Sequence, residues 1–114
     1  GWTSLTEEQR DFWTKFDDDL CFQKEHIKEL LPLEIIEIDE EPRTEFLERR
    51  NLSNCESIWL YGKATEPTEF SHEYKSDSAF LTIERGTDSG IHATYEFKKN
   101  SGEWALVRII DESN

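Results

Sequence analysis

IHATYEFKKNSGEWALVRII, residues 91–110, decides the fold of this chain. Its first seven residues alternate, with Ile91, Ala93, Tyr95 and Phe97 on one face, which is the pattern of a half-buried β-strand. Asn and Gly tolerate positive φ, so the Asn-Ser-Gly at 100–102 is typical of a tight turn. Strands joined by so short a turn must run antiparallel, and the stretch therefore predicts a hairpin whose second strand closes the sheet.

Further strands are expected on the N-terminal side of this hairpin. Residues 79–84 (AFLTIE) are rich in β-branched and aromatic side chains, and a turn at 87–90 follows them. Residues 70–74 and the short run 58–61 (IWLY), which ends near Gly62, are also predicted strands. The second half of the chain thus favours an antiparallel meander.

A helix is predicted over residues 3–17, with Thr3 or Ser4 as its cap and two glutamates in its first turn. Its apolar side chains recur every three to four residues, which predicts one stripe packed on a broad surface. The stripe consists of Leu5, Phe12, Trp13, Phe16 and Leu20.

A second helix is predicted over about 18–31. The Asp run at 17–19 ends the first helix and offers caps for the second, and Pro32 is expected to stop it. Residues 33–38 favour a short strand. The interval 39–56 has no clear period: 39–42 is typical of an acidic turn, and 45–50 fits either a helix or a strand.

Helices followed by an antiparallel meander indicate an α+β fold, and 114 residues fit a single domain, 1–114. We expect N-terminal helices packed on a curved antiparallel sheet, a cone with an open end. Such cones often hold a pocket. Trp59 and Tyr61, on one face of the predicted strand, and Tyr95 are the candidate pocket or rim residues.

The net charge of −13, from 13 basic and 26 acidic residues, bears on partners. Nucleic-acid binding needs Lys and Arg to neutralise phosphates, so we expect no nucleic-acid partner, and anionic membranes should repel the chain too. No run approaches the ~20 apolar residues that cross a bilayer. Solubility explains such acidity, and docking onto a basic protein is the alternative.

Cys21 and Cys55 allow one pairing, which would close a loop of about 35 residues and add about 3–4 kcal/mol in the chain-entropy model. The bridge requires an oxidising compartment, and two buried free thiols are the alternative. Two lone cysteines without a CxxC or HxxxH partner give no metal site.

No catalytic or cofactor-binding residue is predicted. His26 is expected at the surface or the edge of the core, His72 in an exposed loop, and His92 on the outer, solvated face of its strand. No two of them lie at metal-ligand spacing. Serines lack a nucleophile-elbow context, and the glycines form no phosphate-binding loop. We therefore expect no enzyme, no cofactor and no metal.

A family resemblance adds to this reading. Its residues are the following: Phe12, Phe16, Asp19, Phe22, Gln23, His26, Ile27, Pro32 and Leu33, then Trp104–Ile109 and Asp111. With these, the chain resembles small exported or lipid-anchored bacterial proteins of nuclear-transport-factor-2-like, or cystatin-like, cone-shaped fold. The resemblance implies a protein that works outside the cytoplasm and supplies no catalytic residues.

Three functions follow as hypotheses. The first is a non-enzymatic exported domain that binds a small ligand or a cell-envelope partner. The second is an acidic immunity or inhibitor-type protein that caps a basic toxin, and the third a small lyase or isomerase with a buried carboxyl near a Tyr hydroxyl. The chain opens on Gly1 without an initiator Met, which is typical of a cleaved tag, so we expect a signal peptide or lipid anchor to have been trimmed.

Overall fold

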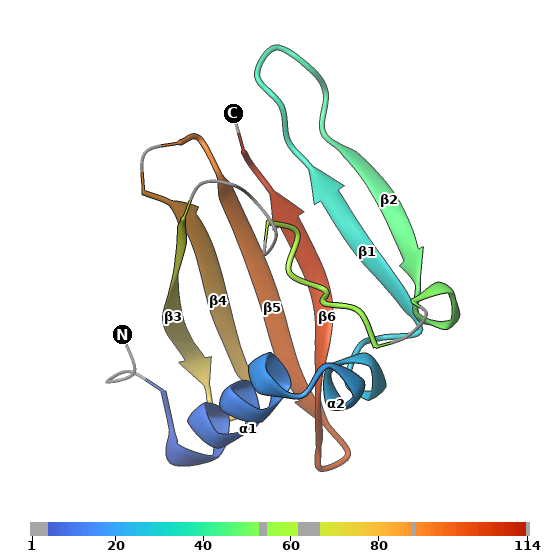
Figure 1. Cartoon of the computed structure of the whole chain (residues 1–114), viewed down its shortest axis with the longest axis vertical. Helices are drawn as coiled ribbons and strands as arrows, with labels where there is room; N and C mark the ends of the chain where they lie inside the picture. The colour runs from blue at the N-terminus through green and yellow to red at the C-terminus, as the bar shows by residue number, and fades with distance from the viewer. Residues whose placement is uncertain (1–4, 53–54, 62–66, 88, 114) are drawn as a thin grey trace.

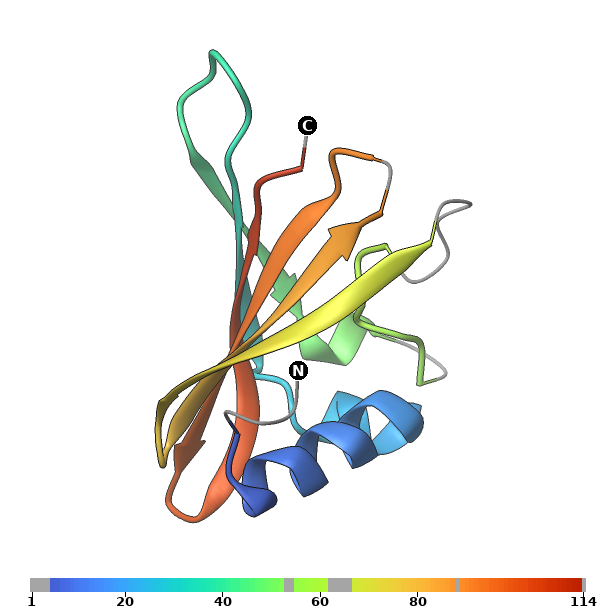
Figure 2. The same ribbon diagram turned by 90° about the vertical axis from the view of Figure 1, so that its left-hand side faces the viewer.

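The computed structural model describes residues 5–52, 55–61, 67–87 and 89–113. They form one six-stranded sheet in the order β2-β1-β6-β5-β4-β3, with two helices across its lower end (Figure 1). Both helices lie on the same side of the sheet, which curves around them (Figure 2). The molecule is therefore α+β, and its core lies between the helices and the inner face of the sheet. Among these described residues no helix has the length and apolar content to cross a membrane.

The predicted meander is confirmed. Strands β3 (Thr68–Ser76), β4 (Ala79–Gly86), β5 (His92–Asn100) and β6 (Glu103–Asp111) pair antiparallel in sequence order. Ala93, Tyr95 and Phe97 of β5 are fully buried on one face, as their alternation indicates. Gly102 has positive φ in the turn before β6, as expected, but the second residue with positive φ is Ser101 and not Asn100. Asp88, in the predicted turn 87–90, lies outside the described residues.

The prediction of a wholly antiparallel sheet is wrong at one pair. β1 (Leu30–Ile35) pairs antiparallel with β2 (Arg43–Glu48) but parallel with β6, so the sheet is mixed and β6 lies inside it. A 3₁₀ turn, η2 (Arg49–Asn51), follows β2. The segment 45–50, which fitted helix or strand, is thus strand and then 3₁₀ turn.

The second helix is much shorter than predicted. Helix α2 covers only Leu20–Glu25, because the chain beyond it turns to pair with β6. Ile27 bridges Leu106, and the backbone N–H of Lys28 donates to the Leu106 carbonyl oxygen at 2.9 Å. Pro32 lies within β1 and does not end a helix. Regular pairing with β6 begins only after it, at Leu33, so its missing N–H leaves that ladder intact.

Helix α1 covers Glu7–Asp18 and begins at Thr6, whose hydroxyl oxygen accepts from the Gln9 backbone N–H while the Gln9 side chain accepts from the Thr6 N–H. The predicted caps, Thr3 and Ser4, lie outside the described residues. Most of the predicted stripe packs into the core as expected, with Phe16 fully buried. Leu20 is the exception at 38% exposed, because the helix breaks at Asp19 and the new axis turns Leu20 outward.

Candidate functional site

The segment Cys55–Tyr61, called the plug segment from here on, closes the space between the helices and the sheet. It was predicted as a strand over 58–61, which is wrong: none of its described residues pairs in the sheet. Its backbone N–H groups bind side chains instead. The N–H of Ile58 donates to Gln23 Oε1 at 2.6 Å, that of Trp59 to Ser57 Oγ, and that of Leu60 to the Tyr95 hydroxyl oxygen.

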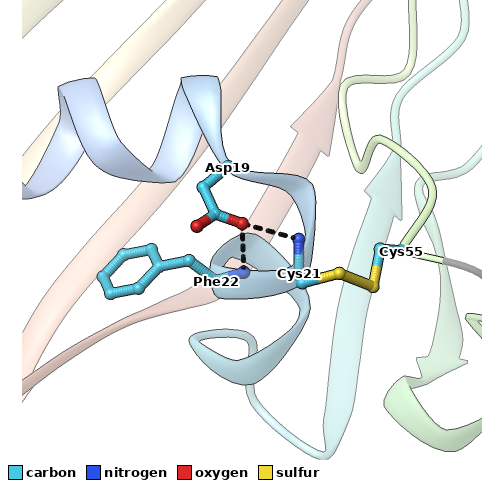
Figure 3. Close-up of a disulfide and its surroundings, with 4 residues drawn as sticks. All are labelled: Asp19, Cys21, Phe22 and Cys55. Atoms are coloured by element: carbon cyan, nitrogen blue, oxygen red, sulfur yellow. Dashed lines mark hydrogen bonds between the residues drawn. A yellow bond between two sulfur atoms is a disulfide. The ribbon is translucent and has the colours of Figure 1, made fainter.

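A disulfide fixes the start of the plug segment. Cys21 and Cys55 are bonded, with Cα atoms 4.7 Å apart, so the plug segment is tied to helix α2 (Figure 3). Asp19 caps that helix beside the bridge, since its Oδ1 accepts from the backbone N–H groups of Cys21 and Phe22. This arrangement replaces the alternative of two free thiols.

Helix side chains hold the middle of the plug segment. The buried Gln23 side chain donates to the Phe16 carbonyl oxygen at 3.0 Å, so the Gln23 oxygen is aimed at Ile58. The Trp59 indole N–H donates to Asp17 Oδ1 at 2.8 Å. Burial raises the pKa of the Asp17 carboxyl, and this hydrogen bond acts against that effect. The plug segment is therefore attached at several points.

Behind the plug segment lies a carboxyl group with a tyrosine beside it. Glu84 is fully buried, and its Oε1 accepts from the Tyr95 hydroxyl at 2.8 Å while Oε2 accepts from the Thr68 hydroxyl at 3.2 Å. Burial, with the nearby Glu84, raises the pKa of Tyr95 well above its ordinary value. Each oxygen of Glu84 thus has a hydrogen-bond partner within the protein.

The second such pair lies nearer the surface. The Tyr61 hydroxyl donates to Asp111 Oδ2 at 2.7 Å, and burial raises the pKa of Tyr61. Of the three predicted pocket or rim residues, Trp59 and Tyr95 are buried and Tyr61 is half-buried. Glu84 and Asp111 were missed as their partners. The signal available for Glu84 was its place on the inward face of a strand, in step with Phe80 and Thr82.

Aromatic rings fill the interior around these groups. Trp59 lies edge-on against Phe16 and Tyr95, with centroids 5.5 and 4.8 Å apart, and it touches Phe70 at 5.1 Å. Phe97 stacks on Phe80 at 4.8 Å. Trp59 thus packs on the same tyrosine that binds Glu84.

The histidines differ from one another. His72 lies in β3 and not in a loop: its ring packs edge-on against Trp13, with centroids 4.6 Å apart, and Nδ1 lies 3.0 Å from Thr82 Oγ1. Burial lowers the pKa of His72 to about 4, so the prediction of a surface histidine is wrong. His26 stacks on Phe22 at the edge of the core, and His92 lies half-buried on the outer face. The described residues contain no group of three His, Cys, Asp or Glu able to hold a metal ion.

The β1–β2 hairpin is the most exposed part of the sheet and rises beyond the other strands (Figures 1 and 2). Every residue from Glu37 to Phe46 is exposed. Large apolar side chains are among them, with Ile38 72% and Phe46 57% exposed. Arg43 lies within 4 Å of three glutamates, and the nearby Glu37 raises the pKa of Glu40.

Comparison with known proteins agrees with this architecture. No protein-family model and no curated protein sequence matches the chain. Among solved structures, a nuclear-transport-factor-2-like protein from Bacteroides fragilis superimposes with a TM-score of 0.63 at 17% identity over 90% of this chain. The chain spans only 46% of that protein.

Two further structures resemble the chain over nearly their whole lengths. One is a nuclear-transport-factor-2-like protein of unknown function from Shewanella baltica, with a TM-score of 0.54 at 11% identity over 97% of this chain and 98% of that one. The other is a protein of the DUF4783 family from Bacteroides uniformis, with a TM-score of 0.54 at 10% identity over 89% and 92%. The chain has the nuclear-transport-factor-2-like fold, as its opening and closing residues predicted.

Proposed function

On this nuclear-transport-factor-2-like fold, we propose that the chain is a non-catalytic domain that binds another protein outside the cytoplasm. The observation that carries the proposal is that Glu84, the carboxyl group best placed for catalysis, already has protein partners. The hydroxyls of Tyr95 and Thr68 donate to its two oxygens, and Trp59 of the plug segment packs edge-on against Tyr95. An interior arranged in this way supplies stability and leaves the outer surface for binding.

The Cys21–Cys55 disulfide supports the compartment. Cys21 is exposed and Cys55 half-buried, so the bridge is within reach of cellular reductants and persists best where the surroundings are oxidising. The test is to quench cells making the full-length gene product with trichloroacetic acid, which freezes the thiol state, and then to label the denatured protein with a thiol-reactive polyethylene glycol maleimide. We expect no mass addition at either cysteine, because both are in the disulfide, whereas two additions would show the reduced thiols of a cytoplasmic protein and overturn an extracytoplasmic location.

A small lyase or isomerase is the second candidate, because the buried Glu84 lies against the Tyr95 hydroxyl. Such an enzyme would need the plug segment to open and admit a substrate. Titration with small apolar ketones, followed by amide chemical shifts, separates the two functions. We expect no saturable change at the backbone of Glu84 and Tyr95. A saturable 1:1 shift there that is lost in the Glu84→Gln variant would favour the enzyme.

A further inference from the structure

Strand β2 forms a free edge of the sheet, and its backbone suggests how the protein partner of the proposed function is bound; this inference rests on that function. Among the described residues β2 pairs with β1 alone, so its other side presents unpaired backbone N–H and C=O groups. Such an edge accepts an added strand when nothing covers it. We propose that β2 (Arg43–Glu48) docks an extended segment of a protein partner in which basic and apolar residues alternate.

The two faces of β2 specify this alternation. Leu47 and Glu45 lie opposite Leu31 and Leu33, which are buried, so these two side chains belong to the inner face. Phe46 lies opposite Pro32 and belongs to the outer face. Neighbouring side chains on one face of a sheet contact each other across strands. A docked strand therefore meets Arg43, Glu45 and Leu47 with every second residue and Thr44, Phe46 and Glu48 with the residues between. Glu45 and Phe46 lie on opposite faces at the middle of this edge, and a basic residue opposite Glu45 would be followed by an apolar residue opposite Phe46.

Exposed apolar surface is concentrated at this edge. Six large apolar side chains among the described residues are exposed, and four of them lie in the β1–β2 hairpin: Leu30, Ile36, Ile38 and Phe46. Solitary exposed apolar residues need no explanation, but a group beside an open strand edge is typical of a binding surface. The apolar residues of the partner segment would cover this group and remove its apolar surface from water.

Charge decides what kind of partner fits. Residues 30–48 contain seven Asp or Glu and one Arg, a net charge of −6 within a chain of −13. Arg43 lies within 4 Å of Glu37, Glu40 and Glu45, while Arg50 pairs with Glu48 and Arg108 with Glu34, so these three arginines offset only part of the acidic excess. A second copy of this chain would bring one acidic edge against another, which disfavours edge-to-edge dimers. A basic partner relieves the repulsion, and long-range attraction speeds its approach.

The opposite edge strand, β3, is a poorer edge. Its register shifts between Tyr74 and Ser76, and the Gln9 side chain of helix α1 donates to the Ser76 carbonyl oxygen at 2.8 Å. A bulge and a covering side chain both hinder strand addition. This asymmetry makes β3 the internal control for β2.

The experiment uses a capped nine-residue peptide of alternating Val and Lys or Arg as the probe. Binding is followed by fluorescence anisotropy and by amide chemical shifts of the labelled chain. We expect saturable binding that weakens with added NaCl, with shifts concentrated in Arg43–Glu48. Phe46→Ser and Glu45→Lys should each weaken it about tenfold. Glu73→Lys, the same charge change on β3, should alter it less than twofold.

Two modified probes test whether charge and backbone pairing hold the peptide at β2. A peptide with Glu in place of every Lys and Arg should not bind the natural chain but should bind the Glu45→Lys variant better than the natural chain. Methylating one alternate set of the probe's backbone nitrogens should abolish binding and methylating the other set should not, because only one set faces β2. The inference is overturned if both methylated probes bind with the affinity of the unmethylated probe, if the shifts fall on β3, or if the basic probe shows no binding at millimolar concentration. These failures leave the proposed function standing, since thiol labelling and ketone titration test it independently.

Discussion

Replacing Tyr95 by Phe tests whether the buried tyrosine and carboxyl pair is structural. The variant loses one hydroxyl that donates to Glu84 Oε1 at 2.8 Å and accepts from the Leu60 N–H at 2.9 Å. A buried polar group left without its partner costs about 1–3 kcal/mol, and more where a charge is involved. Glu84 keeps the Thr68 hydroxyl, so we expect a total loss of about 3 kcal/mol. For a chain of this length that corresponds to a fall in Tm of about 12 °C.

Thermal unfolding of the oxidised protein, followed by near-ultraviolet circular dichroism, measures this loss. The matched control is Tyr74→Phe, because the exposed Tyr74 hydroxyl donates to Asp77 near the surface. It should change the stability by less than about 0.5 kcal/mol. Adding Glu84→Leu to Tyr95→Phe should cost less than the two single losses together, since the partners are removed jointly. If the Tm of Tyr95→Phe falls by less than 3 °C, the structural role is refuted and the catalytic role is favoured.

Removing the disulfide with the double substitution Cys21→Ala and Cys55→Ala should lower the free energy of unfolding by about 3–4 kcal/mol in the chain-entropy model, and a urea midpoint equal to that of the natural chain would contradict this. Because the pKa of His72 falls to about 4 in the folded chain against 6.5 unfolded, its contribution to stability is complete above about pH 6.5 and is lost as the pH falls toward 4. The pKa shift of His72 sets an upper limit of about 3 kcal/mol on the free energy of unfolding lost by acidification, and the partial exposure of the ring reduces the expected loss to about 2 kcal/mol. Urea unfolding between pH 4 and 7 should show this loss, and His72→Gln should flatten the profile. Asp19→Ala should cost about 1 kcal/mol through the lost cap of α2, whereas Asp18→Ala, measured in the same urea titration, should cost less than half of that.

The hairpin 91–110 was predictable because its local signals agree. Alternation, a turn that tolerates positive φ and a second apolar run all point to one antiparallel pair. Its register was not predictable. The pairing shifts between Glu96 and Phe97, so that Glu96 lies opposite Arg108 and Phe97 opposite Leu106. No residue type near Glu96 and Phe97 predicts this register shift, because the packing of the two faces of the sheet determines where the bulge lies.

Pairing between distant segments explains the errors around Pro32. The apolar residues of 20–31 fit a helical period, and a proline normally ends such a pattern. In the folded chain, backbone groups of β6 compete for this segment and bind it from Ile27 onward. Because β6 lies more than 70 residues away in the sequence, nothing within the window 18–31 reveals that partner. Tertiary contacts override local propensity here.

The contacts of the plug segment also depend on residues that are distant in the sequence. The alternation of Trp59 and Tyr61 predicts a strand, because the sequence does not reveal the side-chain acceptors Gln23 and Tyr95 that bind this backbone instead. Each lies 35 residues from the N–H group that it accepts. The contact is visible only after the sheet and helices are placed.

The buried interior and the exposed β1–β2 hairpin contribute differently to stability. Leu31, Leu33 and Leu47 anchor the β1–β2 hairpin to the core, while Glu37–Phe46 lie beyond it and are exposed. Changes at Phe46 or Glu45 therefore alter binding with little cost in folding, since surface substitutions usually stay within about 0.5 kcal/mol. Changes at Trp59 or Tyr95 do the opposite, because the Trp59 indole N–H donates to Asp17 of helix α1 and the Tyr95 hydroxyl accepts from the Leu60 N–H, which ties the plug segment to the helix and the sheet.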